Sequence, residues 1–183
     1  MRLVALQPAY RAIHQPVARW CIFDAMSRPA FPIRIIMQRR RLVSRWTDET
    51  WEVHGVVAGI AGEPRTVERI VETDAVTQYL VGGFQLELFR DEAEGYYLNV
   101  AAPEPRVFVM WRKEEGQEVA LPVQVSLSYN EAARRVDSSE NVDAVPMPRD
   151  ILIWVGEYVE SNYRPEPKQK GPRRNKPSFE ERH

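Results

Sequence analysis

Apolar and polar residues alternate along much of the middle of the chain, which is the spacing typical of β-strands. The clearest case is residues 121–129, where apolar or aromatic side chains take the odd positions and proline, glutamine and serine the even ones. This spacing predicts a strand that is buried on one side only. Pro122 has no backbone donor, so we expect it at the start of a strand or at a sheet edge.

Other segments extend the strand pattern in both directions. Residues 106–112 are apolar on both faces, and the polar, glycine-containing stretch that follows predicts a hairpin with residues 121–129. By the same logic, residues 84–89 and 96–100 are expected to form a second hairpin. Further strand-like segments are residues 33–38, 51–60, 66–71 and 77–81, the last leading into a bend at Gly82-Gly83. The pattern predicts seven or eight strands.

The spacing changes near the end of the chain and predicts one helix over residues 148–163. Pro148 suits a first helical turn, where its missing donor costs nothing, and Asp150 suits the positive end of the helix dipole. Apolar residues then recur at three- and four-residue spacing and form one stripe: Ile151, Trp154, Val155, Tyr158 and Val159. We expect this stripe to cover the sheet. A shorter helical turn is a second possibility at residues 131–136.

The predicted fold is therefore mainly β (α+β), with an antiparallel sheet of about seven strands in a sandwich or partly open barrel, capped by one C-terminal helix. A chain of 183 residues with 44% apolar side chains suits a single core. Residues 1–32 contain several prolines and are expected to form a poorly ordered extension, and residues 33–163 a single domain. Residues 164–183 are basic and rich in proline, which predicts a disordered tail.

Charge is unevenly distributed, although the net charge is only -1. Residues 1–45 hold nine arginines and one aspartate, whereas residues 46–163 hold nine basic and twenty-two acidic side chains. Residues 164–183 hold seven basic and three acidic side chains. Binding to nucleic acid favours positive charge on the folded body, so the acidic body argues against a nucleic-acid partner.

The small number of cysteines and histidines and the lack of a long apolar run bear on cofactors and on the cellular compartment. Cys21 is the only cysteine and there are three histidines, which offer no cluster of metal ligands and no internal disulfide. No apolar run approaches the length that spans a bilayer, and the first residues do not form the apolar stretch of a secretory signal. We expect a cytoplasmic protein with no membrane partner, no metal and no cofactor.

No arrangement typical of catalysis is found in the sequence. His54 lies alone in a strand pattern, and no serine or cysteine lies in a recognisable nucleophile motif with a partner histidine. Gly82-Gly83 is flanked by strands rather than followed by a helix, which favours a turn or bulge over a phosphate-binding loop. The carboxylates fall in predicted turns or on the polar helix face. We therefore expect a protein that is not an enzyme.

Arginine and tryptophan concentrate in one segment, which is the best candidate for a partner-binding surface. The candidate residues are Arg39, Arg41, Arg45, Trp46 and Trp51. Exposed arginine and tryptophan side chains often anchor protein partners. The alternative is structural, with the arginines on a charged edge strand and the two indoles packed in the core.

The basic tail supplies a second candidate surface. Its Lys168, Lys170, Arg173 and Arg174 lie among prolines with almost nothing to bury. Charged disordered segments often fold onto a partner of opposite charge, so these residues are expected to contact an acidic protein.

Several short motifs, taken in order, resemble an uncharacterised proteobacterial family whose genes lie beside those for molybdenum formate dehydrogenase and its accessory proteins. The motifs are Pro32–Arg40, Arg45-Trp46, Trp51–Val53, Ser128–Arg135 and Val142–Pro148. The family has no established activity and no catalytic residues to carry over. Some members carry labels from molybdopterin guanine dinucleotide synthesis, but this sequence lacks the glycine-rich loop that such an enzyme needs.

The resemblance and the residues together predict a non-enzymatic accessory or assembly factor that binds a protein partner in formate dehydrogenase biogenesis. The partner is expected to be a dehydrogenase subunit or a sister accessory protein. The alternative is a small-ligand protein of molybdenum cofactor metabolism, which would bind a pterin or nucleotide with Arg39, Arg41 or His54 as anion contacts.

Overall fold

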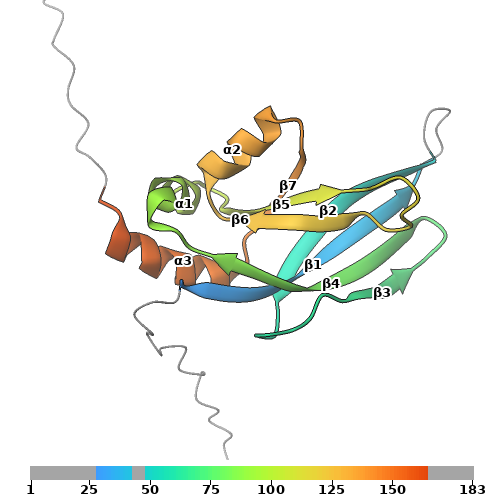
Figure 1. Cartoon of the computed structure of the whole chain (residues 1–183), viewed down its shortest axis with the longest axis horizontal. Helices are drawn as coiled ribbons and strands as arrows, with labels where there is room; N and C mark the ends of the chain where they lie inside the picture. The colour runs from blue at the N-terminus through green and yellow to red at the C-terminus, as the bar shows by residue number, and fades with distance from the viewer. Residues whose placement is uncertain (1–27, 43–47, 165–183) are drawn as a thin grey trace, which may run out of the picture.

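The computed structural model describes residues 28–42 and 48–164, and shows seven strands and three α-helices within these ranges (Figure 1). The strands are β1 (Ala30–Arg41), β2 (Glu49–Ala58), β3 (Val67–Glu72), β4 (Val76–Glu87), β5 (Arg106–Arg112), β6 (Leu121–Ser126) and β7 (Asn141–Pro146). The helices are α1 (Ala93–Val100), α2 (Tyr129–Asp137) and α3 (Arg149–Asn162), and a 3-10 turn, η1 (Arg90–Glu92), precedes α1.

The strands form two antiparallel sheets, which confirms the predicted fold class. The first sheet has the order β2-β1-β4-β3 and the second the order β6-β5-β7. The two sheets lie against each other with β6 near β4 and β7 near β2, and they do not close into a barrel in the described part of the chain. The long strand β1 starts at Ala30 rather than at Ile33, because Ala30–Ile33 pair with the end of β4.

The core lies between the sheets and follows the alternation of the strands. On β1, Ile33, Ile35 and Met37 point inward and are fully buried. On β5 the inward residues are Val107 and Val109, which are also fully buried. Burial of such aliphatic side chains stabilises a fold by about 1.5–3 kcal/mol each, so the inner faces carry most of the stability of this sandwich.

The outer face of the second sheet is covered as well, by α2. Phe108 of β5 is buried on this face, where its ring packs edge-on against Tyr129 of α2 at a centroid distance of 5.9 Å. Ser126 of β6 pairs with Phe108 and is also buried. The expectation that β6 is buried on one side only was therefore wrong, because the polar face of β6 packs against a helix instead of meeting solvent.

The C-terminal helix α3 confirms the predicted helix and its apolar stripe. Ile151, Val155 and Val159 are buried in the core. The ring of Trp154 packs on Phe31 of β1 at 5.4 Å. Figure 1 shows α3 beside α1 at the end of the sandwich where β1 begins, so the stripe covers this end of the core.

Helix α1 replaces the predicted strand at residues 96–100, and the second predicted hairpin is wrong. Tyrosine, leucine and valine in this segment favour a strand by propensity. The folded chain instead buries Ala93, Tyr96 and Asn99, which recur at helical spacing, against the neighbouring elements. Strand propensity is weak against such burial, so tertiary packing decides the element.

The glycine pair also differs from its predicted role as a bend between two strands. Strand β4 runs through Gly82-Gly83 without a break, and its register against β1 shifts at this point, opposite Arg34. Gly83 has a φ of +77°, and a Cβ there would lie 2.7 Å from the backbone nitrogen of Arg65. The pair therefore forms a bulge, one of the two alternatives that the sequence left open.

Strand β7 was not predicted, and it joins the two sheets along one side. The carboxylate of Asp143 accepts hydrogen bonds from the backbone N–H of Val53 in β2 (2.7 Å) and from the indole N–H of Trp111 in β5 (2.9 Å). A single oxygen, Oδ2, accepts both bonds. Asp143 thus links the edge of β2 to the second sheet, and we call this side the closed seam.

Replacing Asp143 with alanine should lower the free energy of unfolding by about 1–3 kcal/mol, because two half-buried donors lose their acceptor. Asp143→Asn should cost less, since one amide oxygen can still accept both bonds. The measurement is urea unfolding at neutral pH, with Asp137→Ala, an exposed aspartate at the end of α2, as control. Equal losses for Asp143→Ala and Asp137→Ala would show that the closed seam adds no stability.

Candidate functional site

Two of the predicted partner-binding residues, Arg39 and Trp51, lie together where β1 meets β2. The Trp51 side chain is only 8% exposed and its ring stacks on Tyr79 of β4 at 5.8 Å. Its indole N–H donates to the carboxylate of Glu49 at 2.9 Å. Trp51 therefore anchors the core, which is the structural alternative for this residue.

Positive charge surrounds the same indole. The Arg39 guanidinium lies 6.0 Å from the centre of the Trp51 ring and donates to the hydroxyl of Thr77 at 3.2 Å. Lys113, in the β5–β6 connection, forms an ion pair with Glu49 and lies 5.3 Å from the same ring. Both cations are thus engaged within the chain, as cation–π and charge-assisted contacts.

The other predicted residues fall elsewhere. Arg41 is exposed at the end of β1, and Arg40, on the opposite face from Arg39, pairs with Glu52 at 2.6 Å. Arg45 and Trp46 lie outside the described residues. The same holds for the tail residues, which are Lys168, Lys170, Arg173 and Arg174. His54 is exposed on β2 and does not join Arg39 and Trp51 in their cluster.

Glu49 should give this cluster a pH-dependent stability. The bonds from Lys113 and from the Trp51 indole lower the pKa of Glu49, which means that the folded state favours its carboxylate form. Its contribution is therefore present above the ordinary glutamate pKa and is lost as the pH falls through the lowered value.

We expect Glu49→Gln to be less stable than the parent protein at neutral pH, with the difference shrinking below about pH 5. Urea unfolding measured from neutral to acidic pH checks this, with the exposed Glu157→Gln in α3 as control. A difference that stays constant with pH would contradict the role given to the carboxylate charge.

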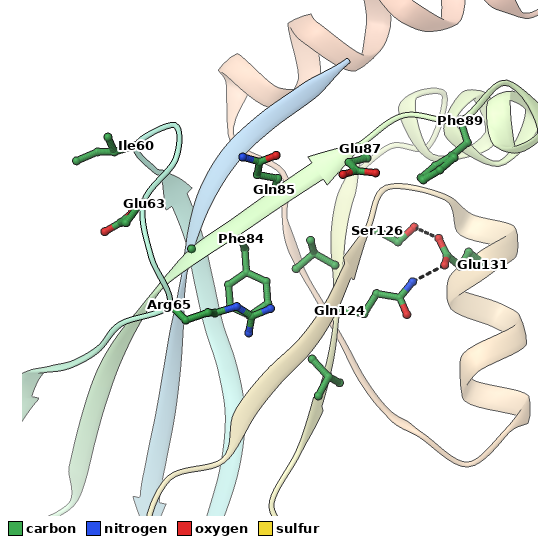
Figure 2. A pocket seen from close by; sticks show the side chains of 13 residues that line it. Ile60, Glu63, Arg65, Phe84, Gln85, Glu87, Phe89, Gln124, Ser126 and Glu131 are labelled. Carbon is green, nitrogen blue, oxygen red and sulfur yellow. Dashed lines mark hydrogen bonds between the residues drawn. The ribbon is translucent and has the colours of Figure 1, made fainter. Parts of the chain in front are cut away.

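A surface groove of about 410 Å³ lies between β4 and β6 (Figure 2). It is on the opposite side of the sandwich from the closed seam, which lies between β2 and β7. Its lining comes from the loop after β2 (residues 60–65), from residues 83–89, from residues 123–126 of β6 and from Glu131 of α2. We call this feature the seam groove. It is the candidate site that the sequence did not reveal.

The loop at one end of the seam groove is held by two arginines. Glu63 forms a two-pronged ion pair with Arg34 of β1, with N–O distances of 2.8 and 2.9 Å, and the guanidinium lowers the pKa of this carboxyl. Arg65 places its guanidinium over the ring of Phe84 at 3.6 Å and donates to the carbonyl of Pro122 in β6 at 3.3 Å. The loop therefore spans from β1 across β4 to β6.

A polar network closes the other end. Both carboxylate oxygens of Glu131 accept hydrogen bonds at 2.6 Å, one from the amide of Gln124 and the other from the hydroxyl of Ser126 (Figure 2). The Gln124 carbonyl in turn accepts from Arg135 at 2.8 Å. Ser128 caps α2, because its hydroxyl accepts from the backbone N–H of Glu131.

Residues 32–172 match a family of proteins of unknown function, DUF3305. The chain belongs to this family. The matched range takes in most of β1, every later described element and the whole lining of the seam groove. No curated protein and no solved structure matches the chain.

The DUF3305 domain shows two further general features. In the described ranges, no helix is long and apolar enough to cross a membrane. Within the same ranges, no three histidine, cysteine or carboxylate side chains gather in a way that could hold a metal ion.

Only weak local signals could have pointed to the seam groove. The glycine pair marks the place where the loop crosses β4, and the run Ser128–Arg135 supplies a cap and a helix that reach its far end. Nothing in the alternation of β4 or β6 shows that these strands lie side by side. Their proximity arises from the packing of the two sheets.

Proposed function

We propose that this protein is a non-enzymatic accessory or assembly factor that binds a protein partner. The observation that carries the proposal is the seam groove, whose walls are strand edges with apolar side chains and whose ends are polar. Protein partners often add an extended segment to such an exposed sheet edge. The acidic body, which would repel nucleic acid, is consistent with a protein partner.

The partner is expected to be a subunit of a molybdenum formate dehydrogenase or a sister accessory protein. This finer statement rests on the resemblance to the family whose genes accompany those of the dehydrogenase. Four of the motifs that carry the resemblance lie in described elements: Pro32–Arg40 in β1, Trp51–Val53 in β2, Ser128–Arg135 in the cap and body of α2, and Val142–Pro148 in and just after β7.

A tagged full-length chain, expressed in cells that make the dehydrogenase, tests the proposal. We expect a dehydrogenase subunit or a sister accessory protein to be enriched at mild salt over an untagged control. Recovery of neither would overturn the assignment to this enzyme. Capture of unrelated proteins alone would also count against it.

A small-ligand function is the second candidate, because the volume of the seam groove lies within the range of about 300–1,000 Å³ that is usual for ligand sites. Calorimetric titration of the full chain with a pterin and with a guanine nucleotide tests it. Heat that saturates at one ligand per chain supports this candidate, and the absence of heat removes it.

A further inference from the structure

The seam groove runs along strand edges rather than over the face of a sheet. Successive residues of one strand point to opposite faces, so a groove over a face would be lined by every second residue. The seam groove is instead lined by the consecutive residues Gly83, Phe84 and Gln85 of β4, and by the four consecutive residues 123–126 of β6.

The edge of β4 has no neighbouring strand at this place. Strand β3 pairs with β4 from Thr77 to Val81 only, whereas β1 pairs with β4 as far as Glu87. Among the described residues, the stretch from Phe84 to Glu87 therefore has a strand on one side and the seam groove on the other. Its outward backbone groups are available to an added strand.

The opposite side of the sandwich shows how a seam is closed in this fold. There, the carboxylate of Asp143 accepts hydrogen bonds from the backbone N–H of Val53, at the edge of β2, and from the indole N–H of Trp111. Across the seam groove, the side-chain hydrogen bond that joins the loop beside β4 to β6, among the described residues, runs from Arg65 to the carbonyl of Pro122. The seam groove occupies the remaining space between these two strands.

Apolar side chains border the open seam. Val123 of β6 is 46% exposed and Phe89 is 36% exposed, while Phe84 forms part of the buried floor. Val123 lies at the shift in register between β6 and β5, which turns it out of the core. These side chains offer contacts to the apolar residues of an extended segment.

The glutamates that line the seam groove have partners within the chain, whereas Arg65 has no carboxylate partner among the described residues. Glu63 is paired with Arg34, Glu131 accepts two hydrogen bonds, and Glu87 lies 3.7 Å from Arg28. Arg65 has no carboxylate partner in the part of the chain that the structure describes, and it uses one donor, to a backbone carbonyl. The Arg65 side chain is exposed overall, and the partial desolvation of its guanidinium, which packs against Phe84, lowers its pKa.

We propose that the seam groove binds an extended segment of the partner protein, which adds as a strand to the edge of β4 at Phe84–Glu87 and pairs an acidic side chain with Arg65. The segment lies beside β4 beyond Gly83, because Arg65 and Thr66, which lead into β3, already lie beside Gly82 and Gly83. A planar guanidinium binds a carboxylate through two parallel bonds, so Arg65 selects for an acidic residue at one position. The inference rests on the proposed function as a protein-binding factor.

Selection of random peptides of about ten residues, displayed on phage, against the full-length chain tests the inference, because an added strand of this length would cover the exposed edge. We expect the enriched peptides to share an aspartate or glutamate at one position, flanked by aliphatic, aromatic or β-branched residues. The best of these peptides should slow amide hydrogen exchange at Phe84–Glu87. No enrichment, or enrichment without a shared acidic position, would overturn the proposal.

Two variants with matched controls separate binding from folding. Arg65→Glu should weaken binding of the enriched peptide by about tenfold or more, whereas Arg69→Glu in β3, which is also exposed, should not. Arg65 packs on Phe84, so thermal unfolding must confirm that the variant is folded. Val123→Lys changes only an exposed side chain and should also weaken binding, with the exposed Val57→Lys of β2 as its control.

The outcomes distinguish this site from the proposed function. If the tagged protein recovers a dehydrogenase subunit but Arg65→Glu and Val123→Lys recover it equally well, the site is wrong and the function stands. If acidic peptides bind through Arg65 but no dehydrogenase protein is recovered, the site stands and the assignment to the dehydrogenase is wrong. Enriched peptides that match residues 1–27 of this chain would indicate that the groove binds the chain's own N-terminal segment. That result would overturn the proposal that a partner protein occupies it.

Discussion

Replacing Asn99 with aspartate should destabilise the fold by about 3 kcal/mol or more, because its buried amide makes three hydrogen bonds to backbone groups. Asn99 is 1% exposed in α1. Its NH₂ group donates to the carbonyls of Arg106 (2.7 Å) and Leu127 (2.8 Å), and its carbonyl accepts from the N–H of Arg106 (2.9 Å). An aspartate would turn a carboxylate oxygen toward two carbonyl oxygens.

Urea unfolding at neutral pH measures this effect, with Asn141→Asp as control. Asn141 is exposed and donates to one carbonyl, that of Trp111, at 3.3 Å, so its variant should change stability by less than about 1 kcal/mol. Burial raises the pKa of an introduced carboxyl, so the loss in Asn99→Asp should shrink at acidic pH, where a protonated oxygen can donate again. Equal losses in the two variants would contradict the bridging role of Asn99.

Replacing Gly95 with alanine should destabilise the protein by about 2 kcal/mol, although alanine favours helices. Gly95 lies inside α1, and a Cβ at this position would overlap the hydroxyl oxygen of Ser128. This hydroxyl cannot move freely, because it accepts from the N–H of Glu131 and donates to the carboxylate of Glu92. The variant therefore forces α1 and the start of α2 apart.

Gly156→Ala is the matched control for Gly95→Ala. Gly156 also lies inside a helix, α3, but a Cβ there would meet nothing within 4 Å. The substitution should stabilise the protein by about 0.5–1 kcal/mol, since alanine loses less backbone entropy than glycine. Opposite signs for the two variants in urea unfolding are the expected result. A gain in stability for Gly95→Ala would show that Ser128 can move aside.

Elements whose pattern matches their final burial were predictable from the sequence. The stripe of α3 recurs at helical spacing because only one face of this helix meets the core. The predicted hairpin of β5 and β6 is confirmed, because the two strands pair in antiparallel register. The polar turn between them was the local signal for it. In both cases a local rule and the tertiary structure favour the same element.

Elements whose local pattern and final burial disagree were missed. In α1, the strand propensity of Tyr96 and its neighbours is outweighed by the hydrogen bonds of Asn99 to β5 and to Leu127, just after β6. In β6, the serines and glutamine of the polar face indicated exposure, but Glu131 of α2 satisfies Gln124 and Ser126. Distant partners decided both cases.

The candidate sites divide in the same way. The sequence drew attention to Arg39 and Trp51 through residue type alone, and the structure places them in a shared cluster where the indole supports the core. The seam groove is lined by residues from three parts of the chain that lie far apart in the sequence: 60–65, 83–89, and 123–126 with Glu131. The spacing of apolar and polar residues within one segment does not show which distant segments it will contact.

Taken by itself, the sequence determined the class of the fold, the capping helix and the uneven charge, because these depend on the spacing and type of nearby residues. Only the tertiary structure decided that residues 93–100 are a helix, that Trp51 is buried, and that one seam is closed by Asp143 while the other stays open beside Arg65. The physical reason is that burial and hydrogen-bond partners come from distant segments, and their free energies exceed the small propensities that local sequence expresses.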